Sequence, residues 1–221
     1  MLNLLGQMEQ RNALDKTLLR KLRHCAHVQN LKSNVPDASA LEEYWRGVPL
    51  ADKEDSKLVV AIVHACVAAG ECAAARQIIE EGLGRHWDSE LAQLYGECPE
   101  ENAIGQIERA ETWLESQPND ARLLLALGKL CINRGLWGKA QNYLDASLSV
   151  EPGYSAHLAL AQLNEKIGQT QLAKDHYEKG MALALSRLKV LEQKHLLDNN
   201  EWNGDLLGSH PGSHIPNSSM R

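Results

Sequence analysis

Aromatic side chains are scarce in this sequence: it has no phenylalanine, and aromatic residues make up only 5% of its 221 positions. A β-sheet core of this size would draw on aromatic and β-branched side chains, so their scarcity argues against a sheet. Hydrophobic residues still reach 43%, enough for a sizeable core built from Ala, Leu, Ile and Val. Those residues suit close packing of helices, so we expect an all-α protein.

Long hydrophobic runs are also missing. No stretch approaches the roughly 18 apolar residues of a membrane-spanning helix, and the N-terminus has no apolar signal core with a cleavage site. The chain as it stands is therefore expected to be soluble. Its formal net charge is −6, which gives no overall electrostatic footprint for nucleic acid. Basic residues gather near the N-terminus, where they form either a solvated helix face or a surface for anionic lipid.

Catalytic and metal-binding motifs are absent as well. The sequence has no Gly-x-Ser-x-Gly elbow, no His-Glu-x-x-His and no phosphate-binding loop. The carboxylate pairs Glu80-Glu81 and Glu100-Glu101 are adjacent, so on a helix they point in different directions. The five cysteines show no paired metal spacing and no disulfide framework, which indicates buried thiols in a reducing compartment. We expect neither an enzyme nor a metal protein.

Small and large residues instead recur in step at a spacing of about 33 residues, and this recurrence is the main signal of the sequence. Gly70, Ala75, Ile79 and Gly82 are echoed by Gly135, Ala140, Leu144 and Ser147, and again by Gly168, Ala173, Tyr177 and Gly180. A period of this length is typical of stacked helical hairpins. The sequence predicts a right-handed superhelical solenoid of tetratricopeptide-like hairpins.

The repeat phase divides the chain into three parts. Residues 1–50 are expected to form basic N-terminal helices that pack on the array, the first of them running from residue 2 to about residue 32. Residues 51–198 hold four repeats, at 56–87, 88–120, 121–153 and 154–185, followed by an extension of the last helix. The second repeat is degenerate and contains an irregular loop at 97–101. Residues 199–221 lack periodicity and are expected to be a disordered tail.

The first helices of successive repeats line the concave side of such a solenoid. The repeat phase places seven polar residues there: Lys57, His64, Arg122, Lys129, Asn133, Gln162 and Lys166. They alternate with apolar residues such as Leu125 and Leu158. A groove of this kind would suit an acidic or amide-rich peptide; the alternative is that these side chains simply face solvent. Some repeats of this type use Lys and Asn side chains in the groove to clamp the terminal carboxylate of a partner. Such a clamp is not expected here, because Leu125 and Ala126 occupy the corresponding positions of the third repeat.

Two short patterns carry a weaker hint of haem or metal chemistry. Cys98-Pro99 is similar to the Cys-Pro dipeptide of haem-responsive motifs, but an ordinary inter-helix loop, in which the proline opens the next turn, is the preferred interpretation. His24 and His27 stand three residues apart on one helix face, a spacing that can bind a metal ion. No further ligand lies nearby in the sequence, so a solvated basic helix is the preferred interpretation.

One longer stretch resembles a known family. Leu123-Leu-Leu-Ala-Leu-Gly-Lys-Leu-Cys131, followed by Leu136-Trp-Gly-Lys-Ala-Gln-Asn-Tyr-Leu144, is similar to the C-terminal region of HemY-type protoheme IX biogenesis proteins. The resemblance extends upstream to Tyr44-Trp45-Arg46-Gly47-Val48-Pro49 and covers roughly residues 40 to 185. It implies tetratricopeptide repeats on the cytoplasmic face of a bacterial inner membrane.

The resemblance also implies a role. It points to a non-catalytic protein–protein interaction scaffold for late haem biosynthesis, with the enzymes of that pathway as partners. The family's two spanning helices are absent here, so membrane attachment would come from segments outside this chain. A direct haem or porphyrin-binding protein and a general peptide adaptor unrelated to haem are the alternatives. The flavin-dependent oxidase that shares the family name is excluded, because no Gly-x-Gly-x-x-Gly fingerprint occurs.

Overall fold

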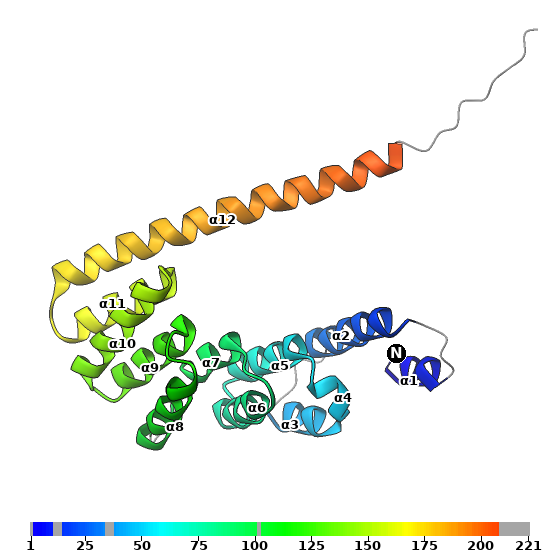
Figure 1. Cartoon of the computed structure of the whole chain (residues 1–221), viewed down its shortest axis with the longest axis horizontal. Coiled ribbons are helices and arrows are strands. Elements are labelled where there is room, and N and C mark those ends of the chain that lie inside the picture. Colours follow the sequence, from blue (N-terminus) through cyan, green and yellow to red (C-terminus); the bar gives the residue numbers. More distant parts are fainter. Residues whose placement is uncertain (1, 11–14, 34–37, 101–102, 208–221) are drawn as a thin grey trace, which may run out of the picture.

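The computed structural model describes residues 2–10, 15–33, 38–100 and 103–207, and these ranges hold twelve helices and no strand. The helices are α1 (Leu2–Gln10), α2 (Lys16–Ser33), α3 (Ala38–Gly47), α4 (Leu50–Lys53), α5 (Ser56–Ala68), α6 (Cys72–Arg85), α7 (Ser89–Tyr95), α8 (Ala103–Ser116), α9 (Ala121–Asn133), α10 (Trp137–Val150), α11 (Tyr154–Lys166) and α12 (Thr170–Leu207). They follow one another along an elongated stack (Figure 1). The predicted all-α solenoid of helical hairpins is confirmed.

Aspartate caps start the first helix of three repeats. The side chain of Asp55 accepts a hydrogen bond from a backbone N–H of α5, and Asp88 and Asp120 do the same for α7 and α9. A helix begins with unpaired N–H groups, so an acceptor at this position stabilises its first turn.

Glycines close three of the hairpins. Gly70, Gly135 and Gly168 have φ angles of 81°, 70° and 80°. This left-handed conformation is disfavoured for residues with a Cβ atom. It ends the first helix of a repeat and turns the chain back within two residues, so the recurring glycine of the sequence is the physical origin of the hairpin.

Two further glycines allow the helices to approach closely. A Cβ atom on Gly128 of α9 would lie 2.5 Å from Cδ2 of Leu144 on α10. One on Gly96, at the end of α7, would lie 2.7 Å from Cα of Ala126 in α9. The first contact explains why the third repeat combines a glycine on α9 with a leucine on α10: the leucine side chain fills the space that a side chain at position 128 would need.

The second repeat departs from a regular hairpin. Its first helix, α7, has only seven residues, and α8 packs against α9. The side chain of Gln106, which is 2% exposed, donates to the carbonyl oxygens of Tyr95 and Cys98, each at 3.0 Å. This one buried amide therefore satisfies a carbonyl group at the end of α7 and another in the segment that follows it.

The N-terminal helices differ from the prediction. Instead of one helix from residue 2 to about residue 32, the structure has α1 and a separate α2, whose first turn is capped by the Asp15 side chain. Helices α2, α3 and α4 pack on α5. Leu41, Trp45 and Val48 join the main core, so this segment completes the first repeat. Asp37, a candidate cap for α3, lies outside the described residues.

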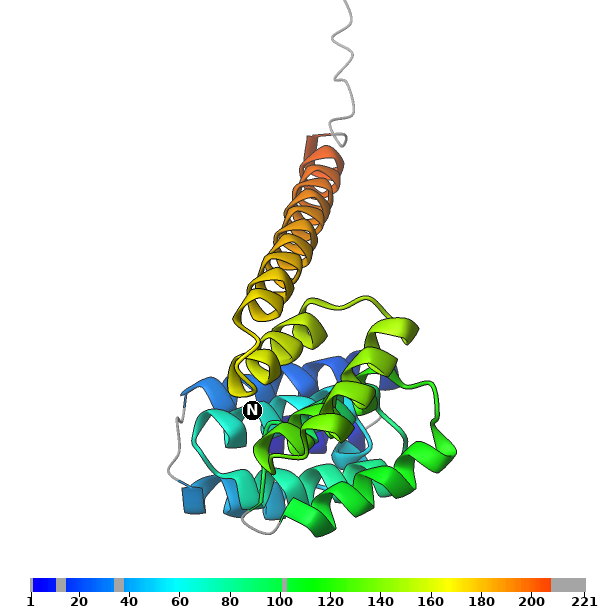
Figure 2. The same ribbon diagram turned by 90° about the vertical axis from the view of Figure 1, so that its left-hand side faces the viewer.

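The last helix is longer than the sequence indicates. Helix α12 continues to Leu207, so residues 199–207 are helical where an unstructured tail was expected; residues 208–221 lie outside the described part. No proline occurs between Pro152 and Pro211, so nothing in the covalent chain stops the helix. Both views show α12 projecting out of the stack (Figures 1 and 2).

None of the described helices combines the length and the apolar character needed to cross a bilayer.

Candidate functional site

The first helices of the four repeats form one continuous surface. Helix α5 packs against α7, α7 against α9, and α9 against α11. Their second helices lie behind this row, so polar residues on the free side of the row share a single face. Two cavities open along it.

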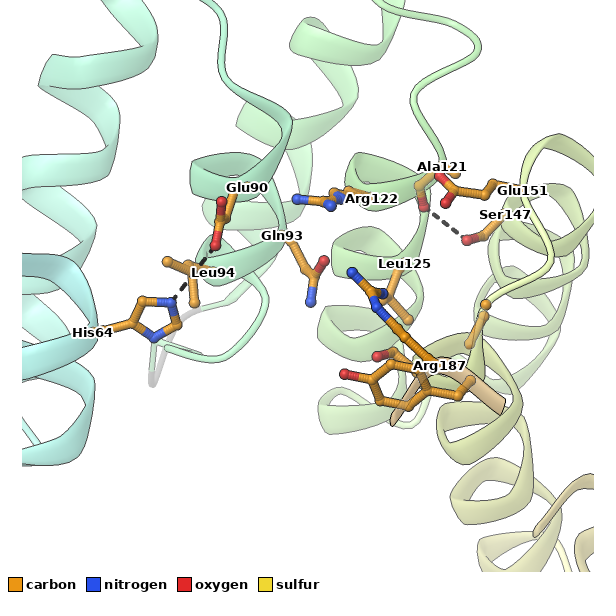
Figure 3. Close-up of a pocket in the computed structure, with 14 residues that line it drawn as sticks. His64, Glu90, Gln93, Leu94, Ala121, Arg122, Leu125, Ser147, Glu151 and Arg187 are labelled. Atoms are coloured by element: carbon orange, nitrogen blue, oxygen red, sulfur yellow. Dashed lines mark hydrogen bonds and ion pairs between the residues drawn. The ribbon is translucent and has the colours of Figure 1, made fainter. Parts of the chain in front are cut away.

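The first cavity has a volume of about 290 Å³ and lies where α5, α7, α9, α11 and α12 meet. Its lining includes His64, Glu90, Gln93, Leu94, Arg122, Leu125, Glu151, Tyr154, Ser155 and Arg187. Figure 3 shows the side chains of Arg122 and Arg187 directed into this space from opposite sides. We call it the arginine cavity.

The charges of the arginine cavity are incompletely paired. Nε2 of His64 lies 4.0 Å from Oε1 of Glu90, and no ion pair to Arg122 or Arg187 forms within the described part of the chain. Leu94 and Leu125, which are 6% and 4% exposed, form an apolar wall. The cavity therefore offers two guanidinium groups beside a dry surface, an arrangement suited to a carboxylate.

The second cavity has a volume of about 430 Å³ and holds three other predicted residues, Lys129, Asn133 and Gln162. The ammonium group of Lys129 forms an ion pair with the carboxylate of Glu97. Leu158 and Ile132 add apolar surface. Ser155 lines both cavities, so the two belong to one groove, which we call the inner groove.

Two predicted residues stand apart from this groove. Lys57 and Lys166 are exposed, and neither lines one of the two cavities. The structure thus brings together five of the seven predicted side chains, two in the arginine cavity and three in the second cavity.

Arg187 is the groove residue that the sequence interpretation missed. It lies on α12, outside the four repeats, but seven residues after Gly180. Residues seven apart share a helix face. Because Gly180 is one of the recurring residues of the repeat phase, that spacing could have revealed Arg187.

Cys98 is not available to a haem group in this structure. Its side chain is 0% exposed, and burial is the main cause that raises the pKa of the Cys98 thiol, followed by a hydrogen bond with Cys72. Iron is ligated by the thiolate, which this environment disfavours. In this structure the thiol of Cys98 is a packing residue, so the haem contact expected there is not favoured.

The two N-terminal histidines face different carboxylates. Nδ1 of His24 lies 3.3 Å from Oδ2 of Asp55, and Nε2 of His27 lies 3.4 Å from Oδ2 of Asp52. Among the described residues no group of three or more His, Cys, Asp or Glu side chains is arranged to hold a metal ion. Since the two histidines point to separate partners, their spacing reflects the packing of α2 rather than a shared ligand.

His27 also belongs to a buried network beside a cavity of about 830 Å³ among α1, α2, α3 and α4. Its Nδ1 lies 2.7 Å from the hydroxyl of Tyr44. Nη1 of Arg23 lies 3.0 Å from Oδ1 of Asp52. The ionisable groups on this wall face one another and tie α2 to α3 and α4, so we assign them a structural role.

A second histidine pair links α11 to α12. Nδ1 of His157 lies 3.0 Å from Nδ1 of His176, with the rings 5.3 Å apart. Burial is the main cause that lowers the pKa of each imidazole; His176 and Lys179 add to the effect on His157, while Asp145 and Asp175 partly oppose it on His176. One ring must donate and the other accept, so the bond cannot survive protonation of both.

Acidification is therefore expected to loosen this contact. A histidine whose pKa is lowered by folding contributes stability that is complete above its unfolded value, about 6.5, and is lost as the pH falls below that value. Both rings are only partly buried, so the expected loss in melting temperature is on the order of 1–2 °C between about pH 7.5 and pH 5.5. His176→Gln should reduce this loss, and His86→Gln, at an exposed histidine, should not. Equal pH dependence in both variants would contradict the assignment.

Comparisons with known proteins find similar solved structures and no matching family. No family model matches the chain, and no curated protein matches it. Among solved structures, MamA RS-1, an ArsTM double mutant, is similar over 84% of this chain and 95% of its own, with 19% identity and a TM-score of 0.45. MamA MSR-1 C2 aligns over 77% and 97%, with 18% identity and a TM-score of 0.41. The likeness is one of helical arrangement at low identity, and it identifies neither a family nor a ligand.

Proposed function

We propose that this protein is a non-catalytic scaffold that binds segments of partner proteins along its inner groove. The observation that carries the proposal is the convergence of cationic and amide side chains from successive repeats on two joined cavities with apolar walls. Guanidinium, ammonium and amide groups recognise side chains and backbone of a bound segment, while the apolar walls supply contact area.

The stacked hairpins suit this task physically. Each repeat packs on its neighbours, so the groove residues are held at fixed separations by the array rather than by the ligand. A groove that is already formed loses little conformational freedom on binding, which favours affinity for an extended segment.

The sequence resemblance supports a narrower proposal. If the chain acts as HemY-type proteins do, its partners are enzymes of late haem biosynthesis and its place is the bacterial inner membrane, attached through segments outside this chain. The support for this step is the resemblance of residues 40 to 185 alone, and a general adaptor for other proteins fits the groove equally well. Direct haem binding is not favoured, because Cys98 is buried.

Site-specific photocrosslinking tests the scaffold proposal. A photoreactive residue is placed at Gln162 in the second cavity, and in a control protein at Asn142, an exposed position on α10. In bacterial cells we expect discrete crosslinked partners from position 162 and not from position 142, because only the first faces the groove. Equal crosslinking from both positions, or from 142 alone, would contradict the proposal. Mass spectrometry of the crosslinked proteins separates haem enzymes from other partners.

A further inference from the structure

We propose that the arginine cavity binds a carboxylate side chain of an acidic partner segment, held between Arg122 of α9 and Arg187 of α12. This inference rests on the proposed scaffold function and names the chemistry of its ligand. In this proposal α12 contributes a ligand-binding side chain to the groove and does not only cover the end of the array.

The placement of the two arginines is the first support. Their side chains enter the same cavity of about 290 Å³ from opposite sides (Figure 3), and within the described residues neither forms an ion pair. Two like charges that face one space repel each other, and an anion between them removes the repulsion. Planar guanidinium groups bind carboxylates through paired N–H donors.

The remaining lining limits what the anion can be. Glu90 and Glu151 lie on opposite flanks of the arginines (Figure 3). They would repel a continuous run of negative charge such as a nucleic-acid backbone. The buried side chains of Leu94 and Leu125 would contact apolar groups beside the carboxylate. The cavity thus fits one or two Asp or Glu side chains within a segment that is otherwise neutral or apolar.

Helix α12 places the second arginine. A Cβ atom on Gly180 would lie 3.3 Å from the carbonyl oxygen of Tyr154, the first residue of α11. The missing side chain therefore lets α12 lie close to the start of α11. Two turns later the same face of α12 has passed the first residue of α11, and Arg187 reaches the groove.

Selection from a random peptide library, displayed on phage, tests this assignment on the full chain. Three proteins are compared: the unaltered chain, the double variant R122Q/R187Q, and the control K57Q/K166Q, which removes two exposed cations outside the cavities. For the unaltered chain and the control we expect recovered peptides enriched in Asp or Glu, because charge pairing selects them. The arginine double variant should lose that enrichment.

The affinity of the variants for one recovered acidic peptide measures how much each arginine contributes to binding. Arg122→Gln and Arg187→Gln should each weaken it about tenfold, as expected for a charged hydrogen bond, and K57Q/K166Q should change it less than twofold. Peptides without acidic preference, or acidic enrichment that persists in R122Q/R187Q, would overturn this inference and leave the scaffold proposal standing. Failure to recover any peptide, together with no groove crosslink at position 162, would overturn both.

Discussion

Leu144→Asp is expected to unfold the third repeat. Leu144 is 0% exposed and lies between α9 and α10, directly against the position of Gly128. The substitution removes a buried leucine, worth about 2–5 kcal/mol in comparable cores, and adds a carboxylate with no partner. We expect a loss of at least 4 kcal/mol in the free energy of unfolding, measured by urea titration, or a drop in melting temperature on the order of 10 °C.

The damage should spread beyond one contact. Helix α11 packs on both α9 and α10, and α12 packs on α11. In a solenoid the stability of each repeat depends on its neighbours, so loss of the third repeat also removes the support of the fourth. Because Arg122 and Arg187 belong to these repeats, acidic peptide binding should vanish with the fold.

A matched control is available on α12. Leu172→Asp makes the same chemical change at a side chain that is 49% exposed, and its cost should stay within about 0.5 kcal/mol. Similar unfolding curves for Leu144→Asp and Leu172→Asp would show that Leu144 does not carry the packing described above.

Much of the fold could be predicted because its determinants are local. The spacing of Gly70, Gly135 and Gly168 placed the turns, since only a residue without Cβ readily takes the conformation found there. Asp55 and Asp120 mark the starts of their helices, because each side chain caps backbone N–H groups two or three residues further along the chain. Such interactions join residues that are close in the sequence, so a short sequence pattern is enough to predict them.

The site was less predictable because it depends on contacts between distant residues. Lys129 lines the second cavity, but its ion pair with Glu97 joins positions 32 residues apart. Arg187 reaches the arginine cavity only because Gly180 packs on α11. Cys98 looked like a candidate ligand as part of a dipeptide, and the burial that inactivates it comes from neighbouring helices.

Asp120 shows how one such distant contact joins two repeats. Its Oδ1 accepts hydrogen bonds from the backbone N–H groups of Arg122 and Leu123, both at 3.0 Å. Its Oδ2 accepts a bond from Nε1 of Trp87 at 2.8 Å and another from the Ser89 hydroxyl. One carboxylate therefore caps α9 and also holds the segment that leads into α7.

These bonds should make the protein sensitive to acid. Burial tends to raise the pKa of Asp120, but the bonds from Ser89, Trp87 and the two backbone N–H groups outweigh it and lower that pKa. A carboxyl whose pKa is lowered by folding contributes stability that is complete above its unfolded value, about 3.9, and is lost as the pH falls below it. Asp120→Asn keeps a capping oxygen for α9, but its NH2 group would face the N–H of Trp87 and cannot accept that bond. The variant should therefore be less stable at neutral pH, and it should also lose less stability below about pH 4.

Asp120→Ala should cost far more than the loss of an ordinary cap. Asp88 supplies the comparison, because its side chain accepts only the backbone N–H groups of Glu90 and Leu91 among the bonds described. Asp88→Ala should cost about 1 kcal/mol, the usual value for a cap, whereas Asp120→Ala should cost roughly 3 kcal/mol, because Trp87 and Ser89 also lose their acceptor. Urea titration of both variants checks the difference. Equal costs would mean that the bonds to Trp87 and Ser89 add nothing to the stability of the contact between the second and third repeats.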